Sequence, residues 1–349
     1  MRIAQLAPTY ERVPPGAYGG TELIVHLLTE ELVRRGHDVT LYASGDSVTS
    51  ARLRSLTPRP MRYGDLQNGL RHAEYLQLAN AQACFLDAAS GDFDVIHNHA
   101  GIEGLVLGAS SRTPVLSTNH LSFVPETQPI WDAYPWAHHS LSAASAATFP
   151  SRGAMPPIHH GIDVSSFPFG DSPEGYLAFL GRFSPEKGAA RAIEAARASG
   201  RRLLLAGKVD SADADHFARD IEPNVDGRQV QYVGEADADT KRRLLAGADA
   251  LLFPIDWDEP FGLVMIEALA SGTPVIGLRR ASVPEVVEDG VTGFVVDDVA
   301  AMADRIGRIG EIDRRACRRA AEQRFNVPRM ADDYERHFMM LVESAASVL

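Results

Sequence analysis

Two glutamates eight positions apart, Glu259 and Glu267, form the most specific chemical feature of the sequence. They lie in the segment EPFGLVMIEALASGTPVI, where residues 260–262 predict a turn and the apolar run after it predicts a helix. The N–H groups at a helix start favour an anion such as phosphate. Glu267, two turns into the helix, is placed to accept hydrogen bonds from ribose hydroxyls, and Glu259 from sugar hydroxyls. The amides predicted to bind phosphate belong to Phe261, Gly262, Leu263 and Val264.

A second charged motif, GRFSPEKG at residues 181–188, directly follows the apolar run YLAFL. Its Arg182 and Lys187 would flank a turn at the carboxyl end of a strand. An arginine grips oxygens in a fork and a lysine acts as a point charge, so the two suit a diphosphate. Only three of the chain's 34 basic residues are lysines, so a lysine here hints at a specific requirement. Ordinary surface charges are the alternative interpretation.

A third motif is the glycine-rich loop PPGAYGGTE at residues 14–22. The adjacent Gly19 and Gly20 would let the backbone approach a ligand closely, and the helix that follows would favour anions. The spacing of these glycines does not match the G-x-G-x-x-G fingerprint of dinucleotide-binding folds. A flexible connector explains the loop equally well.

Strands and helices alternate around these motifs. Residues 2–7 form a short apolar run, residues 21–36 have helical periodicity, and residues 38–43 read as a second strand. This strand–loop–helix–strand order predicts a βαβ unit and a parallel sheet. The same rhythm restarts at residue 176, after a stretch rich in proline and glycine.

The chain is therefore predicted to be an α/β protein with two doubly wound, Rossmann-like domains. The first comprises residues 1–155 and is completed by a final amphipathic helix over 328–349, and the second comprises residues 156–327. Such domains bind ligands at the carboxyl ends of their strands, so we expect one ligand in a cleft between them.

Composition narrows the class of protein. The 349 residues are 45% hydrophobic and 23% charged, which is typical of a globular chain, and a net charge of −12 argues against binding to nucleic acid or to an anionic bilayer. No apolar run is long enough for a membrane span or a signal peptide, so we expect a cytoplasmic protein without stable membrane insertion. Cys84 and Cys317 have no metal-ligand neighbours and are expected to be buried free thiols.

Together these motifs resemble the retaining GT-B glycosyltransferases of family 4. The similarity covers nearly the whole chain. The segment Gly161–Ile162–Asp163 resembles the family's Asn-Gly-Val/Ile-Asp linker, with His160 in place of the asparagine, and residues 284–293 resemble its late C-domain signature. The resemblance implies the GT-B architecture, in which two Rossmann-like domains face each other across a cleft.

The resemblance also implies roles for individual residues. Arg182 and Lys187 would bind the diphosphate of a nucleotide-sugar donor, Glu259 would contact the donor sugar, and Glu267 the ribose. His120 matches a family histidine that lies near the donor sugar, so His120 and Glu259 are the predicted catalytic residues. His97 and His99 are candidate contacts to the acceptor.

The implied reaction is retaining transfer of a hexose to an acceptor hydroxyl. Cations and helix amides would stabilise the departing diphosphate. No cofactor and no metal are expected, and the donor is a substrate, with UDP-glucose favoured over other UDP-, GDP- and ADP-sugars. The Asp256–Trp257–Asp258 sequence resembles a metal-binding Asp-x-Asp, but it follows a late strand and suits another fold.

Three other functions remain open from the sequence. A GT-B sugar-nucleotide epimerase would need no acceptor, a dinucleotide-dependent oxidoreductase lacks its glycine fingerprint here, and a non-catalytic nucleotide-sugar binder would hold the donor without turnover. The acceptor, the linkage and the oligomeric state are not readable. Loop residues that could contribute to an acceptor site are Arg52, Arg54, Arg59 and Arg62.

Overall fold

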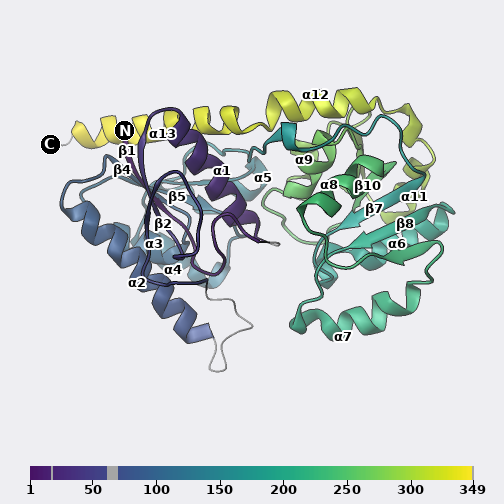
Figure 1. Cartoon of the computed structure of the whole chain (residues 1–349), viewed down its shortest axis with the longest axis horizontal. Helices are drawn as coiled ribbons and strands as arrows, with labels where there is room; N and C mark the ends of the chain where they lie inside the picture. Colours follow the sequence, from purple (N-terminus) through teal and green to yellow (C-terminus); the bar gives the residue numbers. More distant parts are fainter. Residues whose placement is uncertain (17–18, 61–69, 348–349) are drawn as a thin grey trace. The chain divides into compact units, whose positions relative to one another are not determined.

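The structure, a computed structural model, describes residues 1–16, 19–60 and 70–347 and divides the chain into two compact units (Figure 1). The first unit comprises Met1–Gly161 and Val327–Leu349, and the second comprises Ile162–Asn326. The predicted boundaries, after residues 155 and 327, therefore differ from the observed ones. The difference arises because residues 156–161 are bound to the first unit: the Ile158 N–H donates to the Ser140 carbonyl (3.1 Å), and the Arg329 guanidinium donates to the His160 carbonyl (2.8 Å).

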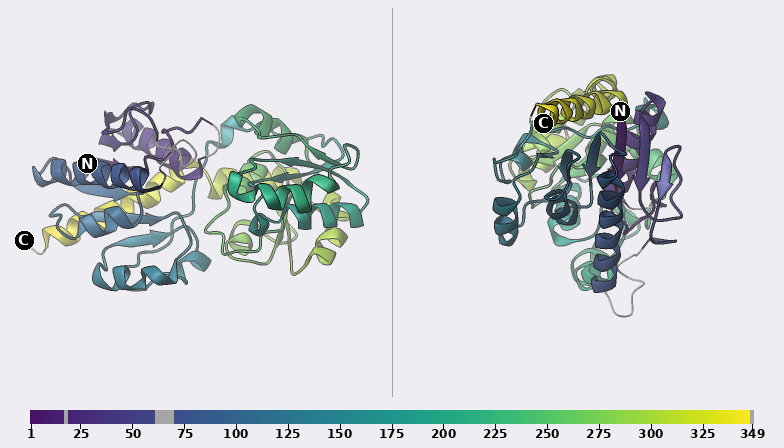
Figure 2. Two further views of the ribbon diagram at one scale, coloured as in Figure 1. Left: turned by 90° about the horizontal axis from the view of Figure 1, so that it is seen from below. Right: turned by 90° about the vertical axis from the view of Figure 1, so that its left-hand side faces the viewer.

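The first unit contains a six-stranded parallel sheet in the order β3-β2-β1-β4-β5-β6. Its strands are β1 (Arg2–Leu6), β2 (Asp38–Tyr42), β3 (Arg52–Arg54), β4 (Val95–Asn98), β5 (Val115–Asn119) and β6 (His138–Ser140). Its helices are α1 (Gly20–Arg34), α2 (Leu70–Ala89), α3 (Ile102–Gly108), α4 (Gln128–Ala133), α5 (Ala143–Ala146) and α13 (Val327–Ala346). Helix α1 packs with α13, and α2 packs with α3, so that helices lie on both sides of the strands (Figure 2). The central strands are buried along their length, as expected of a parallel sheet covered on both faces.

The second unit repeats this design with the parallel order β12-β11-β10-β7-β8-β9. Its strands are β7 (Tyr176–Leu180), β8 (Arg202–Ala206), β9 (Val230–Tyr232), β10 (Ala250–Phe253), β11 (Val275–Leu278) and β12 (Gly293–Val296). Its helices are α6 (Ala189–Ala198), α7 (Ala214–His216), α8 (Ala238–Gly247), α9 (Leu263–Ala270), α10 (Val283–Val286), α11 (Val299–Ile306) and α12 (Arg314–Arg324). The prediction of two Rossmann-like domains is confirmed. Strands β3, β6 and β12 were not predicted.

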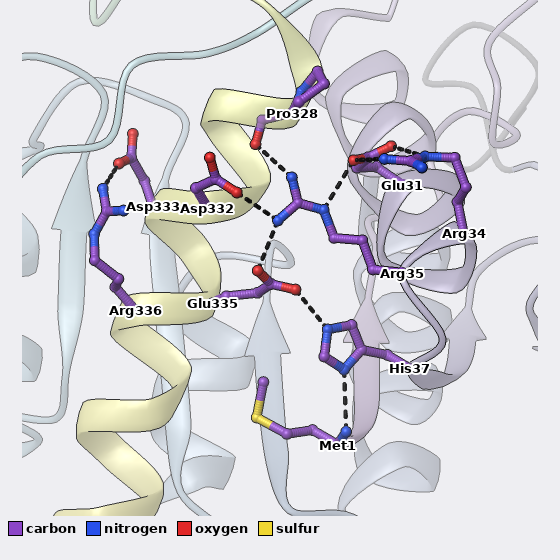
Figure 3. Close-up of polar contacts among 10 residues, drawn as sticks. All are labelled: Met1, Glu31, Arg34, Arg35, His37, Pro328, Asp332, Asp333, Glu335 and Arg336. Carbon is purple, nitrogen blue, oxygen red and sulfur yellow. Dashed lines mark hydrogen bonds and ion pairs between the residues drawn. The ribbon is translucent and has the colours of Figure 1, made fainter.

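Helix α13 returns from the far end of the chain and is fastened to α1 by one arginine (Figure 3). The Arg35 guanidinium donates to Glu31 Oε1 (2.9 Å), to Asp332 Oδ1 (2.6 Å) and to Glu335 Oε2 (2.7 Å), and also to a backbone carbonyl at the start of α13. His37 extends the network, because its Nδ1 accepts from the Met1 ammonium (3.1 Å) and its Nε2 bonds Glu335 (2.7 Å). The Arg35 side chain is only 17% exposed, so water replaces these contacts poorly.

We expect Arg35→Met to destabilise the first unit by about 2 to 4 kcal/mol, because three carboxylates lose a largely buried partner. Urea unfolding measures this loss, and hydrogen exchange should show faster opening of the backbone amides of α13.

The neighbouring Arg34 provides a matched control. Its side chain is 67% exposed and pairs with Glu31 at 2.6 Å. Arg34→Met is therefore expected to lower stability far less than Arg35→Met, because an exposed ion pair contributes little. Equal effects of the two substitutions would show that α13 is held by its apolar face alone.

Candidate active site

The loops that follow β7 and β10 carry the predicted phosphate and sugar contacts of the second unit. The two strands are neighbours in the sheet, so their carboxyl ends, and the loops after them, adjoin. Backbone and side chain tie the loops together: the Asp256 N–H donates to the Glu186 carbonyl (2.7 Å), and Arg191 Nε donates to the Pro254 carbonyl (2.7 Å). Gly188 is in the left-handed region (φ 83°), and a Cβ there would lie 2.1 Å from the Pro254 oxygen, so only glycine fits this approach.

This approach brings Lys187 and Glu259 into direct contact. The Lys187 ammonium donates to Glu259 Oε2 (2.5 Å), and the Trp257 indole N–H donates to the same oxygen (3.0 Å). Lys187 Nζ also lies 4.5 Å from the centre of the Trp257 ring. The two charged side chains are only 16% and 12% exposed. The predicted phosphate cation and the predicted sugar-binding carboxylate therefore form one charge pair.

Arg182, the other predicted phosphate cation, is more open. Its side chain is 32% exposed and lies 3.4 Å from Glu186 Oε1, 3.7 Å from Asp210 Oδ2 and 3.9 Å from Asp213 Oδ2. Burial alone would raise the pKa of Glu186, but the Ser184 hydroxyl, the backbone and the nearby cations outweigh it, and the pKa is lowered. Arg182 thus lies among three carboxylates of its own unit, and binding of a diphosphate by its guanidinium remains a prediction.

Helix α9 begins where the sequence predicted, directly after the turn. Gly262 precedes it in the left-handed region (φ 81°), where a Cβ would lie 2.8 Å from Met265 Cε. The Ser282 hydroxyl fixes the turn by donating to the Phe261 carbonyl (2.8 Å). Whether the amides of residues 261–264 bind phosphate remains a prediction.

Glu267 is buried in α9 and has a partner that the sequence did not assign. Its carboxylate pairs with the Lys241 ammonium of α8, and the Glu267 side chain is 5% exposed. The two glutamates of the motif thus hold two of the chain's three lysines, Lys187 and Lys241. The scarcity of lysine was the available signal for Lys241. Binding of ribose by Glu267 remains a prediction.

The Asp-x-Asp sequence is held by arginine. Arg280 Nη1 donates to Asp256 Oδ1 (2.5 Å), and Arg280 Nε lies 4.0 Å from Asp258 Oδ1. Arg191 lies 3.9 Å from Asp256. The immediate partners of these two carboxylates are therefore cationic side chains of the same unit.

In the first unit, the glycine-rich loop leads into α1. Gly20 is the first residue of α1, and a Cβ on Gly19 would lie 2.7 Å from Pro15 Cβ, so the loop has no room for a larger residue there. Residues 17 and 18 lie outside the described residues. Glu22, to which the sequence assigned no role, is buried at the start of α1, and burial raises its pKa to about 7.

A histidine row, defined here as His139, Thr118, His97, His99 and His120, occupies the carboxyl-end region of β4, β5 and β6. Four of its contacts link neighbouring members: His139 Nε2 to Thr118 Oγ1 (2.7 Å), Thr118 Oγ1 to His97 Nε2 (2.8 Å), His97 Nδ1 to His99 Nε2 (3.1 Å) and His99 Nδ1 to His120 Nε2 (2.7 Å). The predicted catalytic histidine is thus the end of a hydrogen-bonded chain. His97 and His99, predicted as acceptor contacts, are 0% and 3% exposed and belong to this chain.

His160 takes part in the same region of the first unit. It occupies the position at which the family linker has asparagine, and its ring stacks on that of His120 with centroids 5.5 Å apart. The Arg329 guanidinium of α13 donates to the His160 carbonyl (2.8 Å). The histidine that replaces asparagine at this position therefore packs an aromatic ring against that of His120.

The arginines proposed for an acceptor site are dispersed. Arg52 and Arg54 lie on β3 beside Asp38 (4.0 Å) and Asp87 (3.5 Å), respectively. Arg59 is exposed, and Arg62 lies outside the described residues. Among the residues that the structure describes, no helix is both long and apolar enough to cross a membrane.

Known proteins with the same organisation identify the class. Residues 18–164 match the family described as "Glycosyltransferase Family 4", and residues 167–324 match "Glycosyl transferases group 1". A phosphatidyl-myo-inositol mannosyltransferase from Mycolicibacterium smegmatis is 28% identical over 349 residues, which cover 90% of this chain and 86% of that protein.

Solved structures agree. AviGT4, a glycosyltransferase involved in avilamycin A biosynthesis, is 26% identical, with a TM-score of 0.72 and 98% of each chain covered. Anabaena HepE in complex with UDP and glucose shares the fold, with a TM-score of 0.71 and 19% identity over 97% of this chain and 99% of that chain.

Fold, motifs and relatives define a glycosyltransferase enzyme of GT-B architecture. More particularly, the chain belongs to glycosyltransferase family 4.

The raised pKa of Glu22 has a consequence for stability. Because the folded-state pKa of about 7 lies above the ordinary value of 4.5, the folded protein keeps a proton that the unfolded chain loses between these pH values. The contribution of this carboxyl to the free energy of unfolding is therefore fully present below pH 4.5 and is lost as the pH rises through 7. We expect Glu22→Gln to stabilise the protein by about 1 to 3 kcal/mol at pH 8, and to have almost no effect at pH 4.5.

Chemical denaturation of both proteins at the two pH values measures this effect. Glu30, also in α1, is the opposite case: burial raises its pKa, but hydrogen bonds from Ser50 and Thr49 outweigh burial and lower it. Glu30→Gln should therefore destabilise the protein at pH 8. If Glu22→Gln destabilised the protein at pH 8 as well, the folded protein would stabilise the ionised carboxylate, and the pKa of Glu22 would not be raised.

Proposed function

We propose that this protein transfers a hexose from a nucleoside diphosphate sugar to an acceptor hydroxyl, with retention of anomeric configuration and without a divalent metal. The observation that carries the proposal is the Lys187–Glu259 pair, set beside Arg182 where β7 and β10 end. It places phosphate-binding and sugar-binding chemistry in contact. A donor needs both at the junction between its diphosphate and its sugar.

The reaction proceeds by loss of the nucleoside diphosphate from the anomeric carbon. The bond between that carbon and the phosphate oxygen breaks, and negative charge grows on the departing diphosphate. Arg182 and Lys187 face that charge as it forms, and groups that favour the transition state over the ground state accelerate the step. The acceptor oxygen then bonds to the same face of the sugar, and its proton passes to an oxygen of the departing phosphate.

In this scheme neither glutamate forms a covalent bond to the sugar. Glu259 holds sugar hydroxyls, and its charge partner Lys187 holds phosphate. Glu267 binds the ribose. His120 of the first unit contacts the transferred sugar. The scheme differs from that of retaining glycoside hydrolases, in which one of two carboxylates is the nucleophile.

Fixed side-chain cations supply the charge that a divalent metal supplies in other transferases. The Asp256 carboxylate accepts a hydrogen bond from Arg280, and Asp258 lies 4.0 Å from the same guanidinium, which supports a role in fastening the loop. A metal-independent transferase keeps its rate in excess chelator, and a strict requirement for Mg²⁺ or Mn²⁺ would contradict this part of the proposal.

A UDP-hexose is the first donor to test. The Anabaena HepE structure, which shares the fold, contains UDP and glucose, while the similar Mycolicibacterium protein is named as a mannosyltransferase. A thermal-shift panel should therefore contain UDP-, GDP- and ADP-sugars together with NAD(H). The donor that stabilises the protein most is then incubated with it, with and without candidate acceptors. We expect the reaction to take place in the cytoplasm.

We expect Arg182→Gln/Lys187→Gln to abolish the thermal shift with that donor and to lower kcat/KM roughly 100-fold or more, because two charge-assisted contacts to the diphosphate are lost. A charge-matched control is Arg308→Gln/Arg319→Gln, which removes two exposed arginines of the same unit, paired with Glu311 and Asp313. The control should behave like the wild type. Unchanged donor affinity in the Arg182/Lys187 variant would contradict the proposal.

One further variant separates two causes of lost binding. Lys187→Gln leaves the Glu259 carboxylate without its ammonium partner, which alone could distort the loop. Lys187→Gln/Glu259→Gln removes both charges together. If binding of the free nucleoside diphosphate, which lacks the sugar that Glu259 would hold, stays weak in this neutral pair while the fold is intact, the lysine is needed for the phosphates themselves. Conversion of the donor without any acceptor would indicate an epimerase, and binding without turnover a nucleotide-sugar binder.

A further inference from the structure

The pleat of the first sheet sets four polar side chains on one face. Gln5 of β1 is in register with His97 of β4, and Thr118 of β5 is in register with His139 of β6. His97 pairs with Leu116, two residues before Thr118, so all four side chains point to the same side. Helix α13 covers that side, because the rings of Tyr334 and Phe338 lie 4.6 Å and 5.2 Å from that of His97.

Burial keeps the imidazoles of this row neutral. The pKa values of His97 and His99 are lowered well below the ordinary value by burial and by the neighbouring histidines. Burial lowers the pKa of His120 to about 3 and, with a small opposing hydrogen bond, that of His139 also to about 3. A neutral imidazole has one N–H donor and one acceptor nitrogen. Each ring of the row therefore gives one hydrogen bond and takes one.

One backbone carbonyl oxygen then fixes the direction of the whole chain. His139 Nδ1 lies 3.1 Å from the Ser140 carbonyl, which can only accept, so His139 donates from Nδ1 and its Nε2 accepts the Thr118 hydroxyl proton. Thr118 Oγ1 in turn accepts from His97 Nε2, which makes His97 Nδ1 the acceptor.

The direction continues to His99. His97 Nδ1 accepts, so His99 Nε2, 3.1 Å away, must donate. This assigns the oxygen end of the Gln5 amide, 3.0 Å from the same nitrogen, as a second acceptor. His99 therefore carries its proton on Nε2, and its Nδ1 must accept. The remaining neighbour of that nitrogen is His120 Nε2, at 2.7 Å.

We infer that His99 is a positioning residue, which fixes His120 in the tautomer that carries its proton on Nε2 and offers Nδ1 as an acceptor. This inference rests on the proposed function for its consequence: His120 accepts a hydrogen bond from a hydroxyl of the transferred sugar and does not act as a proton donor. The row holds one imidazole in one state, as the carboxylate partner of a catalytic histidine does elsewhere.

The row is poorly suited to carry a proton away from His120. A proton taken up at Nδ1 and passed along every bond would leave His139 as the cation. His139 lies under α13 with the His337 ring 5.7 Å away, and none of the five members of the row is a carboxylate that could balance the charge. Fixing one neutral tautomer is the function that this arrangement supports.

The first experiment is ¹⁵N NMR of histidine-labelled protein at pH 7.5, without any substrate. The spectrum of the wild type should show His120 protonated at Nε2 only, with a scalar coupling across the hydrogen bond to His99 Nδ1. His120→Asn assigns the signals by removing them. A wild-type His120 that is protonated at Nδ1, or that exchanges between both tautomers, would overturn the inference.

Two substitutions at His99 then test the mechanism. His99→Leu removes the acceptor and should abolish the coupling and the single tautomer, with kcat lowered about 10- to 100-fold and a much smaller change in KM for the donor. In His99→Asn the amide oxygen takes the place of Nδ1, so the Nε2-protonated state and most of kcat should return. An unchanged kcat in His99→Leu would contradict the role.

Thr118→Val is the control for loss of buried structure. It breaks the row on the other side of His97 but leaves the Gln5–His99–His120 segment intact. It should lower the melting temperature while His120 keeps its tautomer. The NMR result needs no turnover: a correct tautomer without transfer of sugar would sink the proposed function alone, and transfer with the other tautomer would sink this inference alone.

Discussion

The contact between Lys187 and Glu259 is the interaction on which the proposed donor site depends. Burying an ion pair rarely adds stability, because desolvation of both charges offsets their attraction. Here the pair is largely buried, and the same carboxylate oxygen also accepts from the Trp257 indole. Such an arrangement is better explained by a ligand than by the fold. A diphosphate that approaches Lys187 competes with Glu259, and the carboxylate is then free to take sugar hydroxyls in its place.

The same reasoning extends to the second pair. Lys241 and Glu267 join α8 to α9, and their contact is also shielded. A chain that uses arginine for nearly all of its cations keeps lysine at both glutamates of the motif. A compact ammonium can be displaced by a ligand hydroxyl more readily than a forked guanidinium, which holds a carboxylate through two parallel bonds. The choice of lysine therefore fits carboxylates that must exchange partners.

Features that depend on residues close together in the sequence could be predicted, and features that depend on distant residues could not. Arg182, Lys187 and Glu259 could be named as candidates because each lies within a few residues of a strong apolar strand, and parallel strands bring their carboxyl ends to one edge. Strands β3 and β6 were missed because Arg52–Arg54 and His138–Ser140 are mostly polar and lack the apolar run of a buried strand. Strand β12 is as short and apolar as strands that were predicted, and its first residue was read as the end of the late C-domain signature. The domain boundary was misplaced because residues 156–161 read as a loop but are bound by α13, 170 residues further on.

Contacts between residues far apart in the sequence could not be predicted for the same reason. The partnership of Lys241 with Glu267 depends on how α8 packs on α9, and the order of the histidine row depends on strand register. His97 and His99 were singled out as strand-end candidates for contact with the acceptor, and the structure buries both. Ligands often bind at the strand ends of parallel sheets. Here α13 covers that edge, and no local sequence pattern predicts that a helix from the other end of the chain packs there.

Helix α13 is therefore more than the last element of the first unit. Its Tyr334 and Phe338 rings keep water from the histidine row, and water at the row would let the imidazoles ionise and lose their fixed direction. Its position is set in turn by Arg35, which gathers carboxylates from both α1 and α13 (Figure 3). A charge network on one side of the helix and a neutral hydrogen-bonded row on the other thus depend on the same packing. The inferred tautomer of His120, which His99 fixes directly, thus also depends on helix residues that lie more than 200 positions further along the chain.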